Sequence, residues 1–302
     1  MTASASLPPP LTSSARIGVA ALSGAVDGAT LVRGLEVLET AGFDVVSASN
    51  LGRKHGLFAG SDAERLAGFH ELAADPTIEA ILFARGGHGL LRLLPDIDWD
   101  LLGRRPRWFV GYSDLTPLLT QVVSRFGWVA LHGPLVAADP VLEAGELEAL
   151  RGAMSGTWPY EAALAGVTGG WQDVSGPLVG GCLSLMTSLL GTEWATSAAE
   201  SVLFLEDTHE PLYRVDRMLQ QMRLAGAFDG VHGVVLGSFE TRAGELYEPE
   251  AVVASVRDAA GAGVPVAWGC PSGHCRPNAT LGLGARARVE PETLRLVLSA
   301  ER

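Results

Sequence analysis

The sequence has little positive charge and almost no lysine. Its 302 residues include 22 lysine and arginine residues against 34 aspartate and glutamate residues, which gives a formal net charge of −12. An acidic chain without a basic run lacks the electrostatic surface that binds nucleic acid or an anionic membrane, so we expect neither partner. Lys54 is the only lysine and lies in a loop-like Gly-Arg-Lys-His-Gly stretch. This scarcity argues against Schiff-base chemistry and against a Walker-type phosphate loop.

Long apolar runs and cysteines are also scarce. No stretch approaches the ~18 consecutive apolar residues of a transmembrane helix. Residues 1–15 carry no charge and no continuous apolar core, so we expect a flexible N-terminal tail rather than a signal peptide. The three cysteines, at positions 182, 270 and 275, form an odd and sparse set that does not suggest a disulfide framework. A cytoplasmic location is the simplest interpretation.

Strand-like and helix-like segments alternate in the first half of the chain. A helix is expected over 62–74 because Ser61 precedes it as an N-cap and Glu64 completes the pattern of a capping box. Such alternation is typical of an α/β protein with a parallel sheet covered by helices on both faces, whose ligands bind at the carboxyl ends of the strands. The expected strands are 16–22, 43–48, 80–84, 108–111 and 128–131, and the other expected helices are 29–40 and 115–123.

The character of the sequence changes around 152–170, where glycine and small residues are frequent and periodicity is weak. We interpret this stretch as a linker between an N-terminal domain, 16–151, and a C-terminal domain, 171–302, because chains of about 300 residues usually divide into two domains. The second half is expected to be an α+β domain or a small barrel-like sheet with helices. Its expected strands are 202–205, 233–236, 264–268 and 285–298, and its expected helices are 180–190, 213–224 and 248–259.

Ser113 is the candidate nucleophile. The stretch 107–116 reads Arg-Trp-Phe-Val-Gly-Tyr-Ser-Asp-Leu-Thr, an apolar strand that runs through Gly111 and Ser113 into a helix-like segment. A serine at such a strand-to-helix turn is held out at the edge of the sheet, where backbone N–H groups stabilise a developing oxyanion. Leu115 stands where a nucleophile elbow has its second glycine, and the alternative is that Ser113 or Asp114 only caps the following helix.

A serine nucleophile needs a base and an orienting carboxylate. His274 lies on a loop shaped by glycine and proline after an expected strand, whereas His132 ends a strand and either lines a pocket or terminates that strand. Glu206 ends the strand Ser-Val-Leu-Phe-Leu-Glu-Asp, where a carboxylate pays a desolvation cost unless it is partnered. A metal site built from Cys270, His274 and Cys275 is the alternative, although their spacing is not that of a zinc knuckle.

Several motifs then coincide in order along the chain. They are Arg85-Gly-Gly-His-Gly after an expected strand, Val110-Gly-Tyr-Ser-Asp-Leu-Thr, His132-Gly-Pro, Gly180-Gly-Cys-Leu-Ser, Leu205-Glu-Asp with Tyr213-Arg-Val-Asp-Arg-Met-Leu, and Gly273-His with Asn278 and Thr280. Over about 16–290 this set resembles the LD-carboxypeptidases, the muramoyltetrapeptide carboxypeptidase family of serine peptidases.

The resemblance implies a Rossmann-like N-terminal domain, a β-rich C-terminal domain and an active site between them. It implies a Ser113–Glu206–His274 triad, no metal or cofactor, a cytoplasmic homodimer, and release of the terminal D-alanine from murein tetrapeptides by cleavage of an L,D-amide bond. The backbone N–H groups of Gly87 and Asp114 are the expected oxyanion donors.

Substrate-binding residues follow from the same motifs. Arg85 and the helix N-terminus at Gly181 and Cys182 are the candidates for a terminal carboxylate. His88 borders the expected pocket. For Tyr213 and Arg214, substrate contact and packing on a helix surface stay open as alternatives.

Three positions depart from the usual family pattern. His88 replaces a tyrosine, Cys182 replaces an asparagine, and the run 281–284 reads Leu-Gly-Leu-Gly where Leu-Pro-x-Gly is typical. The first two border the expected pocket and leave the substrate open. A related serine peptidase of the branch that cleaves peptide-nucleotide antibiotics and confers self-immunity is therefore an alternative, and a non-catalytic protein that binds wall peptides is another.

Overall fold

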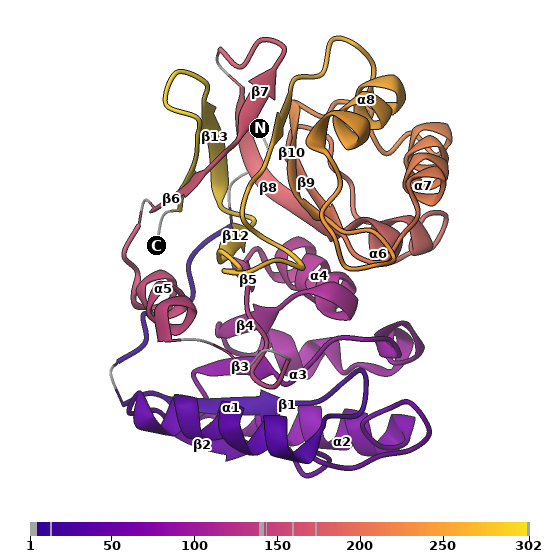
Figure 1. Ribbon diagram of the computed structural model, residues 1–302. Coiled ribbons are helices and arrows are strands. Elements are labelled where there is room, and N and C mark those ends of the chain that lie inside the picture. Colours follow the sequence, from indigo (N-terminus) through magenta and orange to yellow (C-terminus); the bar gives the residue numbers. More distant parts are fainter. Residues whose placement is uncertain are drawn as a thin grey trace.

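Two β-sheets, one above the other in Figure 1, organise the chain. The structure is a computed structural model, and it describes residues 5–12, 14–138, 142, 144–158, 160–172 and 174–300. Within these ranges, no helix has the length and apolar character needed to cross a bilayer.

The first sheet has six strands in the order β12-β5-β4-β3-β1-β2. All neighbouring strands are parallel except β12, which runs antiparallel to β5. Its strands are β1 (Arg16–Ala20), β2 (Asp44–Ser47), β3 (Ala80–Phe83), β4 (Trp108–Gly111), β5 (Ala130–His132) and β12 (Leu281–Leu283). Its helices are α1 (Gly28–Thr40), α2 (Asp62–Ala74), α3 (Trp99–Gly103), α4 (Thr116–Phe126) and α5 (Ala144–Ser155), with 3₁₀ turns at Leu90–Arg92, Leu94–Asp96 and Ser113–Leu115.

The second sheet has eight strands in the order β6-β14-β13-β8-β9-β10-β11-β7. Its centre, from β8 to β11, is parallel, and the outer pairs are antiparallel. Its strands are β6 (Tyr160–Ala163), β7 (Gly166–Thr168), β8 (Ser175–Cys182), β9 (Val202–Asp207), β10 (Gly233–Phe239), β11 (Val266–Trp268), β13 (Arg286–Glu290) and β14 (Arg295–Ser299). Its helices are α6 (Leu183–Ser188), α7 (Leu212–Leu224) and α8 (Pro249–Ala260).

The expected α/β class with a parallel first sheet and a second sheet domain is confirmed. The helix α2 begins as its sequence predicts, because Ser61 Oγ accepts a hydrogen bond from the backbone N–H of Glu64 and the Glu64 carboxylate accepts one from the N–H of Ser61. One hydrophobic core runs between the two sheets, with Phe83 and Phe109 of the first sheet and Phe204 of the second in the same cluster. The two sheets therefore pack against each other through a shared core.

Two segments differ from the sequence-based expectation. The stretch 152–170 supplies part of α5 and the two edge strands β6 and β7, and β12 returns from the second half to pair with β5. These segments form strands because their backbone N–H and C=O groups need hydrogen-bond partners. They find them in strands that are distant in sequence, since β6 pairs with β14, β7 with β11 and β12 with β5. In the tail, Trp108 Nε1 donates to Pro9 O and Ser6 pairs with Trp128, so residues 5–12 lie against the body of the protein. Residues 1–4 and 13 of the expected tail lie outside the described residues.

Candidate active site

Ser113 stands at the carboxyl end of β4, where the strand turns into helix. Its φ of 62° lies in the left-handed region, which a non-glycine residue adopts only when its surroundings impose it. Gly86 faces this turn so closely that a Cβ on residue 86 would lie 2.9 Å from Ser113 Oγ. The turn therefore presents the serine hydroxyl against a stretch of backbone that has no side chain.

The loop that follows β3 carries this bare backbone. Gly86 O accepts a hydrogen bond of 3.0 Å from Gly24 N, and because the peptide is trans, the N–H of Gly87 points in the opposite direction within the peptide plane. The Asp114 carboxylate accepts a hydrogen bond of 2.9 Å from Leu90 N, which ties the end of the loop to the serine turn. The backbone N of Asp114 lies 3.4 Å from the Cβ position of Gly86. The two expected oxyanion donors thus belong to adjoining segments.

Glu206 belongs to the second sheet, and His274 lies on the loop that leads from β11 of that sheet to β12 of the first. Glu206 lies near the end of β9 and is fully buried, and its Oε2 lies 2.7 Å from His274 Nδ1 and accepts a second hydrogen bond of 3.2 Å from the backbone N of His274. A Cβ on Gly273 would lie 2.5 Å from Glu206 Oε2, so only glycine at 273, with a φ of 112°, allows this approach. The carboxylate therefore fixes both the loop and the imidazole.

Glu206 and His274 each shift the pKa of the other so that both charged forms are favoured. Burial of the His274 ring acts to lower its pKa, but the neighbouring Glu206 charge and hydrogen bond outweigh burial and raise the pKa above its ordinary value. For Glu206, burial acts to raise the pKa, and the interactions with His274 outweigh it and lower the pKa. Both directions favour a carboxylate that stabilises a protonated imidazole.

Ser113 and His274 line the same pocket, whose volume is about 500 Å³. The Tyr112 ring packs edge-on against the imidazole of His274, with 4.9 Å between the ring centroids. The other residues that line this active-site pocket are Asp27, Thr30, Arg85, Gly86, Gly87, Tyr112, Leu135, Ala137, Ala138 and His209. The pocket thus joins the serine that follows β4 to the histidine on the loop that follows β11.

His132 ends β5 behind this pocket rather than in its wall. Its ring is fully buried between the rings of Tyr112 and Phe204, and burial lowers its pKa to about 4, so it is neutral at physiological pH. Among the described residues, neither ring nitrogen has a hydrogen-bond partner. Of the two alternatives for His132, the structure places it as the buried end of a strand.

The expected carboxylate site at the start of α6 is already occupied by a side chain of the protein. Asp207 Oδ2 accepts a hydrogen bond of 2.8 Å from Ser184 N. Cys182 is buried, its backbone N donates to Thr116 Oγ1 at 3.2 Å, and burial raises the pKa of its thiol. Gly181 lies against Thr116 as well. Neither Gly181 nor Cys182 is among the residues that line the active-site pocket.

Of the remaining substrate-binding candidates, one lines the active-site pocket and three do not. Arg85 lines the pocket, and its Nη1 donates a hydrogen bond of 2.8 Å to Ala25 O. His88 packs against Phe58 with 5.3 Å between the ring centroids, Tyr213 is exposed on α7, and Arg214 forms an ion pair of 2.9 Å with Glu210. These three are not among the residues that line the pocket.

Sequence reasoning did not find three polar residues of the pocket wall, namely Asp27, Thr30 and His209. Asp27 is the N-cap of α1, so its local pattern is that of an ordinary helix start. His209 follows the acidic end of β9, and its proximity to Glu206 along the chain is the one signal that marks it.

An ion pair between a buried carboxylate and a partly exposed guanidinium anchors the loop that carries His274. Arg276 binds the carboxylate of Glu146 from α5, and Glu146 Oε1 accepts a hydrogen bond of 2.8 Å from Asn278 N. Glu146 is only 4% exposed although it is charged. The loop is therefore held at His274 by Glu206 and further along by Glu146.

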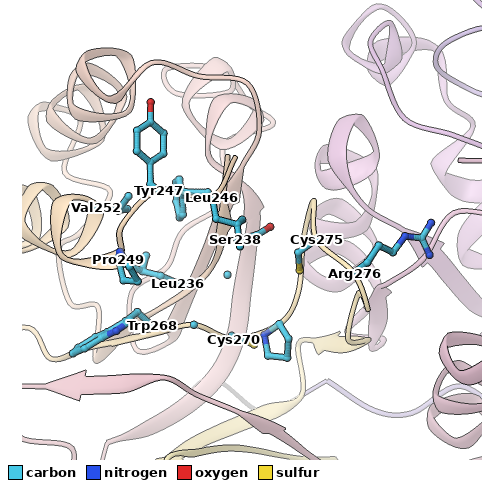
Figure 2. A pocket seen from close by; sticks show the side chains of 14 residues that line it. Leu236, Ser238, Leu246, Tyr247, Pro249, Val252, Trp268, Cys270, Cys275 and Arg276 are labelled. Atoms are coloured by element: carbon cyan, nitrogen blue, oxygen red, sulfur yellow. The ribbon is translucent and has the colours of Figure 1, made fainter. Parts of the chain in front are cut away.

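A second cavity of about 260 Å³ lies on the other side of this loop, at the ends of β10 and β11 (Figure 2). Its walls include Leu236, Pro249 and Trp268, with Cys275 at one side, and the side chain of Arg276 extends away from the other labelled side chains. Neither Ser113 nor His274 lines this cavity. In the described part of the chain, no three His, Cys, Asp or Glu side chains are grouped as metal ligands would be, and the proposed set of Cys270, His274 and Cys275 forms no such group.

Comparison with known proteins gives matches over both halves of the chain. Residues 17–133 match the family model for the LD-carboxypeptidase N-terminal domain, and residues 175–289 match that for the LD-carboxypeptidase C-terminal domain. A Streptomyces coelicolor protein that bears a carboxypeptidase name is 37% identical, over 96% of this chain and 95% of that protein.

Two solved structures are similar over nearly the whole chain. The muramoyltetrapeptide carboxypeptidase from Oxalobacter formigenes is 30% identical over 95% of this chain and 99% of that one, with a TM-score of 0.82. The microcin C7 self-immunity protein MccF in complex with aspartyl sulfamoyl adenosine is 25% identical over 98% of both chains, with a TM-score of 0.87.

Proposed function

Because this chain belongs to the LD-carboxypeptidase family and is a serine-type carboxypeptidase, we propose that it releases the terminal D-alanine of murein tetrapeptides. We assign Ser113 as nucleophile, His274 as general base and Glu206 as the carboxylate that orients the base. The observation that carries the proposal is that Ser113 and His274 share one pocket while Glu206 lies 2.7 Å from His274 Nδ1. Hydrolysis in peptidoglycan recycling is the role that fits this substrate.

The proposed reaction passes through an acyl-enzyme. Since Nδ1 of His274 is held by Glu206, its Nε2 takes the proton of Ser113 Oγ as the oxygen attacks the carbonyl carbon of the L,D-amide bond. That proton then passes to the leaving nitrogen, D-alanine departs as an amine, and Ser113 keeps the acyl group as an ester. Water attacks the ester, His274 takes its proton, and the serine is regenerated.

Backbone amides are proposed to stabilise the negative oxygen of the tetrahedral intermediate. The N–H groups of Asp114 and Gly87 belong to the two adjoining segments that meet at Ser113 and Gly86. In a site shielded from water, such preorganised donors contribute about 3–4 kcal/mol each to the transition state. Gly86 supports this role because it lets the two segments approach without a side chain between them.

Arg85 is the proposed partner of the substrate's terminal carboxylate. Its guanidinium lies in the wall of the active-site pocket and uses Nη1 on Ala25 O, which leaves further donors for a carboxylate. A carboxypeptidase needs a cation at this place because it recognises the free end of its substrate. The capped start of α6 supports giving this role to Arg85 rather than to Gly181 and Cys182.

The alternative substrate is a peptide-nucleotide antibiotic. Similarity to the structure of the microcin C7 self-immunity protein over 98% of the chain favours keeping it as a candidate. Such a substrate needs an aromatic surface on which its base stacks. Among the described residues that line the active-site pocket, Tyr112 is the only Phe, Tyr or Trp, and its ring packs on His274. This arrangement supports the murein peptide as the first candidate.

A direct assay separates the candidates. The purified protein is incubated with a murein tetrapeptide and, separately, with an aminoacyl sulfamoyl adenosine, and the products are identified by mass. We expect release of D-alanine from the tetrapeptide. Cleavage of the nucleotide analogue without release of D-alanine would reverse the ranking, and binding of tetrapeptide without any cleavage would favour the non-catalytic alternative. A homodimer and a cytoplasmic location stay predictions, and sedimentation of the purified protein tests the first.

A further inference from the structure

His132, which opens the motif His-Gly-Pro, is a buried titratable residue to which the proposed reaction gives no role. Its ring is fully buried, and among the described residues neither ring nitrogen has a hydrogen-bond partner. Burial lowers the pKa of the ring to about 4, so it is neutral and has one N–H donor and one bare acceptor nitrogen. A buried donor without a partner destabilises a fold, and a phenylalanine ring would not have this cost. Packing alone therefore does not explain the imidazole.

Glu206 has an acceptor that is left over in the same way. Its Oε2 accepts both hydrogen bonds from His274, whereas its Oε1 has no partner in the part of the chain that the structure describes. The side chain is fully buried, so this oxygen does not face the solvent. Hydrogen bonds to a buried carboxylate stabilise its charged form. Oε1 is therefore suited to a donor that lies inside the protein.

The ring of His132 and the carboxylate of Glu206 lie between the two sheets. His132 ends β5 and packs edge-on against Phe204 of β9, with 5.1 Å between the ring centroids. Phe204 and Glu206 are alternate residues of β9, so their side chains leave the strand on the same face, about 6.6 Å apart along it. The Tyr112 ring lies 5.6 Å from the ring of His132 and 4.9 Å from that of His274. The leftover donor and the leftover acceptor thus belong to one buried cluster.

We propose that His132 is a positioning residue for Glu206, whose Oε1 it holds through one buried water molecule. The water accepts the ring N–H and donates to Oε1, because no direct hydrogen bond joins the two side chains in the described structure. This second contact keeps the carboxylate turned so that Oε2 faces Nδ1 of His274. The inference rests on the proposed function, in which Glu206 orients the base. His132 acts through Glu206, since it is not among the residues that line the active-site pocket.

A double-mutant cycle tests whether His132 acts through Glu206. His132→Phe keeps an aromatic ring against Tyr112 and Phe204 but removes the donor. We expect kcat for D-alanine release to fall about tenfold or more, with KM within about threefold of that of the unaltered protein. In Glu206→Gln, the same substitution should lower kcat by less than about threefold, because the charge that His132 holds is already gone. Equal losses in the two backgrounds would overturn the proposal, since they would show a role in packing alone.

Two conservative variants restore a donor. His132→Asn and His132→Gln place an amide N–H near the positions of Nδ1 and Nε2 of the ring, respectively. At least one of them should keep kcat within about fivefold of the unaltered protein, and a loss as large as that of His132→Phe in both, with thermal unfolding unchanged, would overturn the proposal. His232→Phe is the matched control, because His232 lies just before β10, bonds Ser175 O and is not in the pocket wall, so kcat should be kept.

A proton NMR spectrum distinguishes this inference from the proposed function, because it needs no turnover. The downfield signal of the His274 Nδ1–H reports its hydrogen bond to Glu206. In His132→Phe we expect this signal to move upfield as the carboxylate turns away, and in His232→Phe we expect it to stay. A signal that stays in His132→Phe overturns the role of His132 whether or not the unaltered protein releases D-alanine. A shifted signal without release of D-alanine from a murein tetrapeptide would instead support His132 and count against the proposed function.

Discussion

The turn that carries Ser113 and the loop that carries His274 reach the same pocket by different physical means. Ser113 is placed by backbone geometry, with a φ of 62° and the bare backbone of Gly86 beside it. His274 is placed by polar contacts from distant elements, through Glu206 of β9 and, further along its loop, through Glu146 of α5. The position of Ser113 should therefore be sensitive to a side chain added at Gly86. The position of His274 should be sensitive to loss of the charge on Glu206 or Glu146.

Removal of the proposed nucleophile should have the largest effect. Ser113→Ala is expected to lower kcat/KM for D-alanine release by at least about 10³-fold, because the acyl-enzyme can no longer form. The matched control is Ser188→Ala, on the exposed face of α6. Activity of Ser113→Ala equal to that of the unaltered protein would exclude Ser113 as nucleophile.

Loss of the Glu206 charge tests the polar side of the comparison. Glu206→Gln keeps the size of the side chain but removes the charge that stabilises protonated His274, so kcat/KM should fall about 10²-fold or more. Glu200→Gln makes the same change at an exposed position and should keep the activity of the unaltered protein. Equal effects of the two substitutions would contradict the orienting role of Glu206.

Added volume at Gly86 tests the backbone side. A Cβ there would lie 2.8 Å from Ser113 Cβ, so Gly86→Ala must displace the serine turn. A displacement of this order is expected to lower kcat/KM about 10- to 100-fold. Gly28→Ala is the control because nothing lies within 4 Å of its Cβ position. If thermal unfolding is unchanged and activity is retained in Gly86→Ala, the close packing at Ser113 is not required for catalysis.

The pH dependence should report the charge on His274. Its pKa is raised above the ordinary value of 6.5, and the neutral ring is the active base, so activity is lost as pH falls through that raised pKa. The acid limb of kcat/KM is therefore expected above pH 6.5, with about a tenfold loss per pH unit below it. In Glu206→Gln the limb should move to lower pH, because the lowering effect of burial on the His274 pKa is then opposed only by the smaller effects of Asp207 and Glu240. An unchanged limb in this variant would assign the titration to another group.

The smallest expected effect concerns the anchor of the histidine loop. Glu146→Gln removes the buried charge that faces the partly exposed Arg276 but keeps an acceptor for Asn278 N, so we expect the free energy of unfolding to fall by about 1–2 kcal/mol. Glu148→Gln, exposed on the same helix, should change it by less than ~0.5 kcal/mol. Urea unfolding measures both, and equal values would show that this ion pair does not stabilise the loop.

Local patterns predicted much of the fold and one side of the site. The capping box at Ser61 and Glu64 and the apolar strand before Ser113 are decided by neighbours along the chain, and the structure has both. The role of 152–170 was not predictable in this way. Its strands β6 and β7 are short edge strands whose partners, β14 and β11, lie about 100 or more residues further on. Likewise, no local signal placed Asp27 in the pocket wall, because capping α1 already accounts for it.

By itself, the order of residues determined which side chains were available for chemistry and which backbone turn would present Ser113, since strand, glycine and helix start lie within one short segment. Only the tertiary structure brought Glu206 to His274, which lies 68 residues further along the chain. It also placed the Asp207 carboxylate as a hydrogen-bond acceptor at the start of α6 and His209 in the wall of the active-site pocket. The physical reason is that dihedral preferences and caps act between neighbours, whereas burial of charge and hydrogen bonds between distant residues depend on how the two sheets pack.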